Sequence, residues 1–315
     1  LGFRTLSGMV WLELSWQADA ARVVQIPSPS RIGSGSTLAQ QVQHGLKQLA
    51  LVALEQRGFE RVVLFHFAPR PGEATVRTLV LELMGRHSNV LLLDEQKRIT
   101  AIARQIRQHQ SRVRPLSSGD AYSPPPSLQS LPPESEESIE QWKRRLTLVP
   151  VDLGRALRET YQGISPALTK QLVSLPCVDE AASALTTSTP VGDISENQWV
   201  LLHQRWKSWL QHLSVGDFIL QFDDAGGYRV WNDPADLASD ERPLSLRLGI
   251  YYRDHLHRRQ LHRDHQELQR LLEQSREREQ IQRGEQLDRL KDTDRADELQ
   301  RKADAIFCQA SPDRE

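Results

Sequence analysis

The chain has 315 residues, of which 38% are hydrophobic and 26% charged, and its formal net charge is −1. This length predicts two domains, or one domain with an extended appendage. Because the whole chain is nearly neutral, a nucleic-acid site has to come from local segregation of charge. The two cysteines, Cys177 and Cys308, are far apart, which disfavours a disulfide framework and a thiolate zinc site. No apolar run is long enough to span a membrane and no secretory signal opens the chain, so we expect a cytoplasmic protein.

The first third of the chain has a mixed α/β pattern. Thr37 and Gln40 have the spacing of a capping box. Apolar residues then recur every three or four positions from Leu38 to Ala53, which predicts a helix with one apolar face. Short apolar runs bounded by turn residues predict strands at Phe3–Leu6, Val10–Ser15, Ala21–Ile26, Arg61–Phe67, Thr78–Met84, Val90–Asp94 and Ile99–Ala103. We therefore expect an open sheet or a sandwich with one helix laid against it.

A Pro/Ser-rich segment, Ser117–Glu137, marks a boundary, because it can sustain neither a ladder nor a helix. Two short helices are predicted after it, at Arg155–Gln162 and Ala167–Leu175. Between them, Ser165 suits an N-cap and Pro166 suits the first helical position. A stripe at helical spacing follows, which indicates a core helix rather than an aromatic binding platform. The stripe consists of Trp199, Leu202, Trp206, Trp209 and Leu213.

The last part of the chain begins after a predicted β-hairpin with a Gly-Gly turn at Phe218–Trp231. From Gly249 to about Phe307 charges of both signs alternate, which predicts a long helix of coiled-coil type. Its sparse apolar residues are Leu256, Leu261, Leu268, Leu272, Leu287, Leu290, Leu299 and Ile306. A single arm this polar does not stay ordered alone. We therefore expect a partner helix, from a second copy or from a downstream arm.

The main local charge anomaly is a run from Lys97 to Gly119 that contains no acidic residue. Its basic residues are Lys97, Arg98, Arg104, Arg107, Arg112 and Arg114. Together with Arg86 and His87 they would make one edge of the domain cationic, which is the footprint of a phosphate backbone. The alternative is a solvated surface that happens to lack acids.

Patterns for catalysis or metal binding are weak. His262 and His265 have a spacing that can chelate a metal, but no carboxylate or thiol completes a set of ligands. Glu60 and Arg61 fit a functional pair or an ordinary charged turn equally well. The sequence has no phosphate-binding Gly-rich loop, no nucleophile elbow and no convincing Cys/His pair. We expect neither an enzyme nor a bound cofactor.

A polar turn between two apolar runs, MGRHSNVLLLD (84–94), lies between RGFERVVLFHF (57–67) and RVRPLSSGDAYSPPP (112–126). Together these stretches resemble the N-terminal domain of the NFACT family. Its members include bacterial RqcH proteins, eukaryotic NEMF-type factors and proteins named fibronectin-binding protein A. TYQGISPALTKQL (160–172) looks like the family's helix-hairpin-helix element, and the polar helix looks like the first arm of its antiparallel coiled coil. The chain is most similar in character to cyanobacterial members.

The resemblance implies an α+β fold in three parts. An NFACT-N-like RNA-binding domain, similar to the N-terminal fold of formamidopyrimidine-DNA glycosylases, is expected at 1–126. A helical, helix-hairpin-helix-like region with a terminal β-hairpin is expected at 138–248, and the coiled-coil arm at 249–308. No N-terminal proline nucleophile is present, so glycosylase chemistry is not expected. Family elements appear missing before Leu1 and after Glu315, and we expect a chain truncated at both ends.

The resemblance also implies a function in ribosome-associated quality control. The expected partners are a large ribosomal subunit obstructed by peptidyl-tRNA and a tRNA, alanyl in bacteria. The expected role is to support C-terminal alanine tailing of stalled nascent chains. Two alternatives stay open: a surface adhesin that binds fibronectin, and a non-functional fragment of an NFACT protein.

The family's tRNA-binding motifs fall on identifiable positions. Its Asp-Arg pair corresponds to Glu60 and Arg61, with an acid longer by one methylene, and its Glu-Ile-Met corresponds to residues 82–84. Joined to the acid-free run, these matches give the expected RNA-binding residues. They are Glu60, Arg61, Glu82, Leu83, Met84, Arg86, His87, Ser88, Asn89, Arg104, Arg107, Arg112 and Arg114. Gly85 and Asn89 are expected to shape the backbone. The alternative for part of the turn is structural, with His87 or Asn89 bonded to its own backbone.

Overall fold

The computed structural model describes residues 1–30, 35–107, 109, 114–174, 185–216, 218–222, 227–231 and 242–309. Two compact units divide the chain, Leu1–Tyr251 and Tyr252–Glu315. Arg112 lies outside the described residues, as does most of the turn of the predicted hairpin. The three-part division expected from the sequence stays a prediction.

Two antiparallel sheets form the N-terminal part of the first unit. The smaller sheet has the order β1-β2-β3, and the larger has the order β4-β5-β6-β7-β8, so within each sheet every strand pairs with its neighbour in sequence. The strands are β1 Gly2–Thr5, β2 Gly8–Ser15, β3 Arg22–Ile26, β4 Ala50–Gln56, β5 Val62–Ala68, β6 Arg77–Glu82, β7 Asn89–Leu93 and β8 Ile99–Ile102. These bounds confirm each of the seven strands predicted here, within a few residues at the ends.

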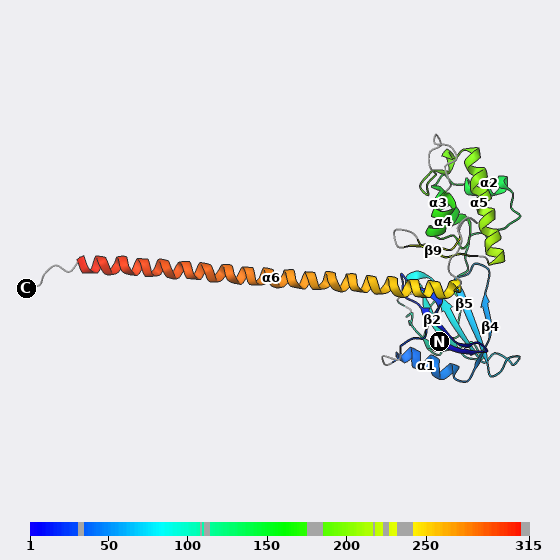
Figure 1. The fold of residues 1–315 in the computed structure, drawn as a ribbon, viewed down its shortest axis with the longest axis horizontal. Helices are drawn as coiled ribbons and strands as arrows, with labels where there is room; N and C mark the ends of the chain where they lie inside the picture. Colours follow the sequence, from blue (N-terminus) through cyan, green and yellow to red (C-terminus); the bar gives the residue numbers. More distant parts are fainter. Residues whose placement is uncertain are drawn as a thin grey trace, which may run out of the picture. The chain divides into compact units, whose positions relative to one another are not determined.

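The larger sheet is buried on both faces, which explains the continuous apolar runs Leu79–Leu81 in β6 and Val90–Leu93 in β7. One face packs against the smaller sheet and against helix α1 (Thr37–Leu46), and the rings of Phe3 and Phe67 stack 6.3 Å apart. The other face is covered by the segment that follows β8, through Ile106, Leu116 and Tyr122. Of the two predicted arrangements, an open sheet and a sandwich, the structure has the sandwich, with one helix laid against it (Figure 1).

The helix predicted from Leu38 to Ala53 is too long. It ends at Leu46, and Gln48 follows with a φ of 63°, a left-handed conformation that a helix cannot contain. The chain then enters β4, which pairs with β5. The predicted capping box is also displaced, because Ser36 is the N-cap and its hydroxyl accepts from the Ala39 backbone N–H at 3.2 Å.

Four helices and a small hairpin follow among the described residues of the first unit. The helices are α2 Ile139–Leu146, α3 Leu153–Thr160, α4 Pro166–Val173 and α5 Glu196–Val215, and the hairpin pairs β9 Gln221–Phe222 with β10 Tyr228–Arg229. Ser165 caps α4 and Pro166 opens it, as predicted. The tryptophan stripe of α5 is a core, since Trp199 and Trp206 are buried and each packs on Trp142 of α2.

Helix α6 spans Leu244–Gln309 as one continuous helix (Figure 1). Its first turns belong to the first unit, where the Ser245 hydroxyl accepts from the Gln25 backbone N–H of β3 at 2.8 Å. In the second unit the leucines expected to form the coiled-coil contact are exposed, for example Leu268 and Leu272. None of the described helices has the length and apolar character that crossing a membrane requires.

Candidate nucleic-acid interface

The polar turn predicted between two buried strands connects β6 to β7 and closes on the pair Glu82↔Asn89. Within it, Gly85–His87 form a short 3-10 helix (η1). Gly85 adopts a φ of 56°, a region that favours glycine. The Ser88 hydroxyl accepts from the Met84 backbone N–H at 2.8 Å, so the turn is fixed from within.

Asn89 ties this turn to the segment after β8. Its carboxamide oxygen accepts from the Arg104 backbone N–H at 2.9 Å, and its amide donates to the Arg104 carbonyl at 2.8 Å. The same oxygen also accepts from the Val90 N–H at 3.0 Å. Asn89 is only 1% exposed and Ser88 is fully buried, so both side chains shape the backbone.

Four exposed basic side chains gather around the turn, and we call them the sheet-end surface: Arg61, Arg86, His87 and Arg104. The Arg104 guanidinium donates to the Arg86 carbonyl, and Arg86 Nε lies 3.1 Å from His87 Nε2. The Arg61 carbonyl accepts from the Leu83 N–H at 2.8 Å, which places Arg61 beside the same turn. All four are among the RNA-binding residues expected from the sequence, and that role stays a prediction.

Acids near this surface are engaged elsewhere or lie at its border. Glu55 at the end of β4 pairs with Arg57 at 3.0 Å and His66 at 3.2 Å, and these contacts, led by the Arg57 hydrogen bond, lower the pKa of Glu55. The β2–β3 loop also approaches the turn, since a Cβ on Gly85 would lie 3.5 Å from the Ala18 carbonyl. That loop carries the exposed Asp19.

Glu82, at the end of β6, is fully buried beneath the turn. Arg114 donates to both carboxylate oxygens, with Nη1 to Oε2 at 3.1 Å, and its Nε donates to the Ser123 carbonyl at 2.7 Å. The Tyr122 hydroxyl donates to Oε1 at 3.1 Å. Burial, reinforced by the Glu82 carboxylate, raises the pKa of Tyr122, so the hydroxyl keeps its proton. Tyr122 was missed from sequence because nothing local connects it to a strand end forty residues earlier.

The acid-free run does not form one cationic edge. Lys97 and Arg98 lie in the β7–β8 turn, and β8 carries the chain to the other end of the sheet before Arg104. Arg107 is exposed further along, whereas Arg114 points inward to Glu82. The expected single edge is therefore wrong: the run is divided between two ends of the sheet and a buried ion pair.

The remaining expected residues are half-buried. The Glu60 carboxylate accepts from the Leu128 backbone N–H at 3.1 Å, which attaches the β4–β5 loop to the Pro/Ser-rich segment. Leu83 packs on the core between the two sheets, and Met84 precedes Gly85.

The histidine pair considered for metal binding lies on α6. His262 Nε2 lies 2.8 Å from Gln266 Nε2, and no cluster of three metal-ligand side chains occurs among the residues that the structure describes.

A family model described as "NFACT N-terminal and middle domains" matches residues 1–312. The chain therefore belongs to the NFACT family, which confirms the resemblance seen in the turn and its flanking strands.

Curated relatives match over shorter stretches. The Rqc2 homolog RqcH of Bacillus subtilis is 30% identical over 123 residues, which are 38% of this chain and 21% of that protein. The Rqc2 homolog RqcH of Streptococcus pneumoniae serotype 2 is 31% identical over 101 residues, or 31% of this chain and 18% of that protein. The matched part thus spans about a fifth of the length of these relatives.

Solved structures share the fold at low identity. The N-terminal part of the fibronectin/fibrinogen-binding protein from Streptococcus suis has a TM-score of 0.57 and 18% identity, covering 81% of this chain and 86% of that chain. The fibrinogen-binding protein from Staphylococcus aureus has a TM-score of 0.51 and 18% identity, covering 73% of this chain and 76% of that chain. The mixed α/β architecture is therefore shared with these two solved structures.

Proposed function

We propose that this chain is an RNA-binding factor of ribosome-associated quality control that holds a tRNA at the sheet-end surface. The observation that carries the proposal is that one turn combines exposed basic side chains with buried polar side chains that hold its backbone. Exposed cations, Arg86 and Arg104 among them, surround a backbone fixed by buried polar side chains. Family membership and the RqcH relatives support the ribosomal role.

The chemistry of the sheet-end surface suits a phosphate backbone. A guanidinium donates two parallel hydrogen bonds to a phosphate, and two such groups beside one rigid turn fix the register of a polyanion. Contacts of this kind position a nucleic acid without reading its sequence. The identity of the tRNA, expected to be alanyl, would then depend on other contacts.

The buried members of the expected site have a different role in this proposal. Glu82, Ser88, Asn89 and Arg114 position the turn rather than contact RNA, because their polar atoms already bond within the chain. In this proposal the four residues of the sheet-end surface, Arg61 among them, contact the RNA. Arg107 extends the same exposed segment.

The wider role follows the family. The expected partner is a large ribosomal subunit that still carries peptidyl-tRNA, on which the factor supports alanine tailing. The ribosome itself performs peptidyl transfer, so the chain needs no catalytic residues of its own. The exposed leucines of α6 favour a coiled coil with a partner helix. The likenesses to formamidopyrimidine-DNA glycosylases and to helix-hairpin-helix elements remain part of this proposal.

Charge reversal at the turn tests the RNA-binding role. Arg86→Glu is expected to weaken binding of a tRNA transcript on the order of tenfold. It should also reduce the salt dependence of the dissociation constant, by a slope of about 0.7–0.9 for each lost phosphate contact. Both quantities come from a filter-binding titration at several salt concentrations.

Arg70→Glu is the matched control, because Arg70 is exposed at the opposite end of the sheet, in the β5–β6 connection. It makes the same change in net charge and should leave tRNA affinity nearly unchanged. If the two variants weaken binding equally, the effect is one of overall charge and the turn has no specific role.

A surface adhesin is the competing function, since the relatives of known structure are described as fibronectin- or fibrinogen-binding proteins. A direct comparison separates the two functions. Immobilised fibronectin and a tRNA transcript are offered to the same preparation. Saturable binding to fibronectin without binding to tRNA would contradict the tRNA-binding proposal and support the adhesin function.

A further inference from the structure

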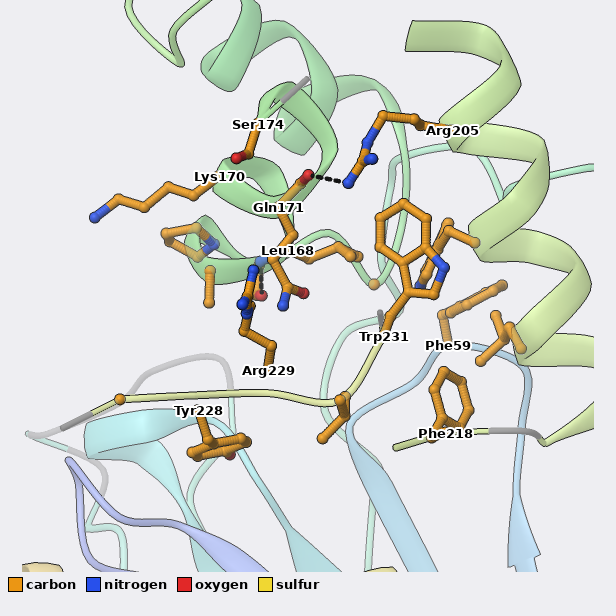
Figure 2. A pocket seen from close by; sticks show the side chains of 18 of the residues that line it. Phe59, Leu168, Lys170, Gln171, Ser174, Arg205, Phe218, Tyr228, Arg229 and Trp231 are labelled. Atoms are coloured by element: carbon orange, nitrogen blue, oxygen red, sulfur yellow. Dashed lines mark hydrogen bonds between the residues drawn. The ribbon is translucent and has the colours of Figure 1, made fainter. Parts of the chain in front are cut away.

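A groove of about 1230 Å³ lies within the first unit, between α4, the end of α5 and the β9–β10 hairpin (Figure 2). Pockets that hold small molecules measure roughly 300–1,000 Å³, so this open groove fits a longer ligand better. Phe59 of the β4–β5 loop forms part of its wall. Gly163 permits this approach, because a Cβ there would lie 2.5 Å from Phe59 Cδ1.

Part of the groove lining is apolar and only half-buried. Phe59, Leu168 and Phe218 pack on the core of the helical part, and each of them also lines the groove. Trp209 and Trp231 line it too, but each is only 6% exposed. An apolar side chain of a ligand would cover the three half-buried residues, and removing their remaining surface from water is favourable.

Three cationic side chains also line the groove, and none of its described lining residues is acidic. Arg205 is held in place, since it donates to the Gln171 carbonyl at 2.9 Å and lies 5.0 Å from the centroid of the Trp231 ring. Lys170 and Arg229 are exposed and form no ion pair among the described residues. Figure 2 shows Arg229 and Trp231 rising from the same side of the hairpin toward α4.

We propose that this groove binds an acidic peptide segment of a partner protein, in which acidic residues flank an apolar anchor residue. The acidic side chains would pair with Lys170 and Arg229, and the anchor would cover the half-buried apolar lining. In interfaces of this kind the apolar anchor provides most of the affinity, whereas the complementary charge selects the partner. The acidic residues of 223–226 and 232–241 lie outside the described residues.

The aromatic residues of the groove favour a peptide over a strand of nucleic acid. Proteins that hold single-stranded RNA stack successive bases on exposed aromatic rings. Here the Arg205 guanidinium already lies over the Trp231 ring, and both Trp209 and Trp231 are almost fully buried, so neither ring is available to a base. The accessible lining consists of half-buried apolar side chains together with exposed cations, which matches apolar and acidic side chains.

The test titrates the full chain into a short fluorescent peptide in which glutamates flank leucines, and wild type should bind it saturably. Lys170→Glu/Arg229→Glu should weaken binding by about tenfold, because two exposed ion pairs become repulsive. The control, Arg144→Glu/Lys207→Glu, makes the same charge change at exposed helical sites outside the groove lining and should leave the affinity nearly unchanged. Thermal melts verify the fold, and Lys170→Ala/Arg229→Ala replaces the reversal pair if that pair fails to fold.

Two matched peptides test the chemistry of the ligand. Lysine in place of every glutamate should abolish binding, and serine in place of every leucine should weaken it. Equal affinity of wild type for either matched peptide and for the acidic one would overturn the proposal. A peptide site here goes beyond the proposed RNA-binding role and is separate from the sheet-end surface. Arg86→Glu should therefore leave peptide affinity nearly unchanged, so that the two proposals can fail independently.

Two further results would overturn the peptide site. One is the absence of saturable peptide binding by wild type. The other is equal weakening of peptide binding by the groove pair and by its control pair. A tRNA transcript is titrated with the same set of variants. If the groove pair weakens tRNA binding and leaves peptide binding unchanged, the occupant of the groove is RNA and the peptide proposal is wrong.

Discussion

Arg114→Leu is expected to lower the free energy of unfolding by about 3–5 kcal/mol, the usual cost of removing one partner of a buried ion pair. Glu82 is fully buried, and Arg114 satisfies both of its carboxylate oxygens. Without the guanidinium, the carboxyl group would remain in the core, and among the described residues only the Tyr122 hydroxyl would still donate to it. Urea denaturation followed by tryptophan fluorescence measures this loss.

A second substitution identifies the cause. Glu82→Gln in the Arg114→Leu background removes the stranded charge and keeps an acceptor for Tyr122. It should recover about 1–3 kcal/mol of stability. Arg98→Leu is the matched control, because Arg98 is an exposed arginine of the same acid-free run. It should change stability by no more than about 0.5 kcal/mol. A double variant no more stable than Arg114→Leu would show that the ion pair does not hold this end of the sheet.

Gly249→Ala is expected to destabilise the first unit, although alanine favours a helix over glycine by about 1 kcal/mol. A Cβ on Gly249 would lie only 2.0 Å from the Gln25 carbonyl oxygen of β3. That backbone atom cannot move aside cheaply, because β3 pairs with β2 along its length. Overpacking of this kind costs about 1–3 kcal/mol.

Gly284→Ala is the matched control in the same helix, and it is expected to stabilise the helix rather than destabilise it. No atom lies within 4 Å of a Cβ built there, so only the helix propensity changes. All seven tryptophans precede residue 252, so the tryptophan bands of the near-UV circular dichroism report the first unit. Gly249→Ala should lower the near-UV melting temperature, whereas Gly284→Ala should leave it unchanged and strengthen the far-UV helical signal. Equal near-UV melting of the two variants would contradict the close packing of α6 on β3.

The sequence was sufficient to predict elements whose cause is local. Leu79 and Leu92 belong to short apolar runs bounded by turn residues, and both runs are buried strands. Ser165 and Pro166 open α4 because capping and the fixed φ of proline act within one turn. The helical spacing of apolar residues continues past Leu46 in the sequence, although the helix ends there. The residues that follow form β4 because they pair with β5, which no local pattern reveals.

The expected site was only partly predictable, because the sequence does not show whether a charged side chain points into the core or toward solvent. Arg114 and Arg104 look alike in the acid-free run, yet one is buried against Glu82 and the other is exposed. Their partners lie 32 and 18 residues away in sequence, beyond any local pattern.

The tRNA-binding proposal is tested most directly by the RNA that copurifies with the tagged protein from its own cells after translation has been stalled. Wild type and Arg86→Glu are purified side by side, and the bound RNA is sequenced. We expect wild type to carry one enriched tRNA together with large-subunit rRNA, and Arg86→Glu to lose most of the tRNA. Equal tRNA recovery with both proteins, or no RNA with wild type, would contradict the proposal that the sheet-end surface binds tRNA.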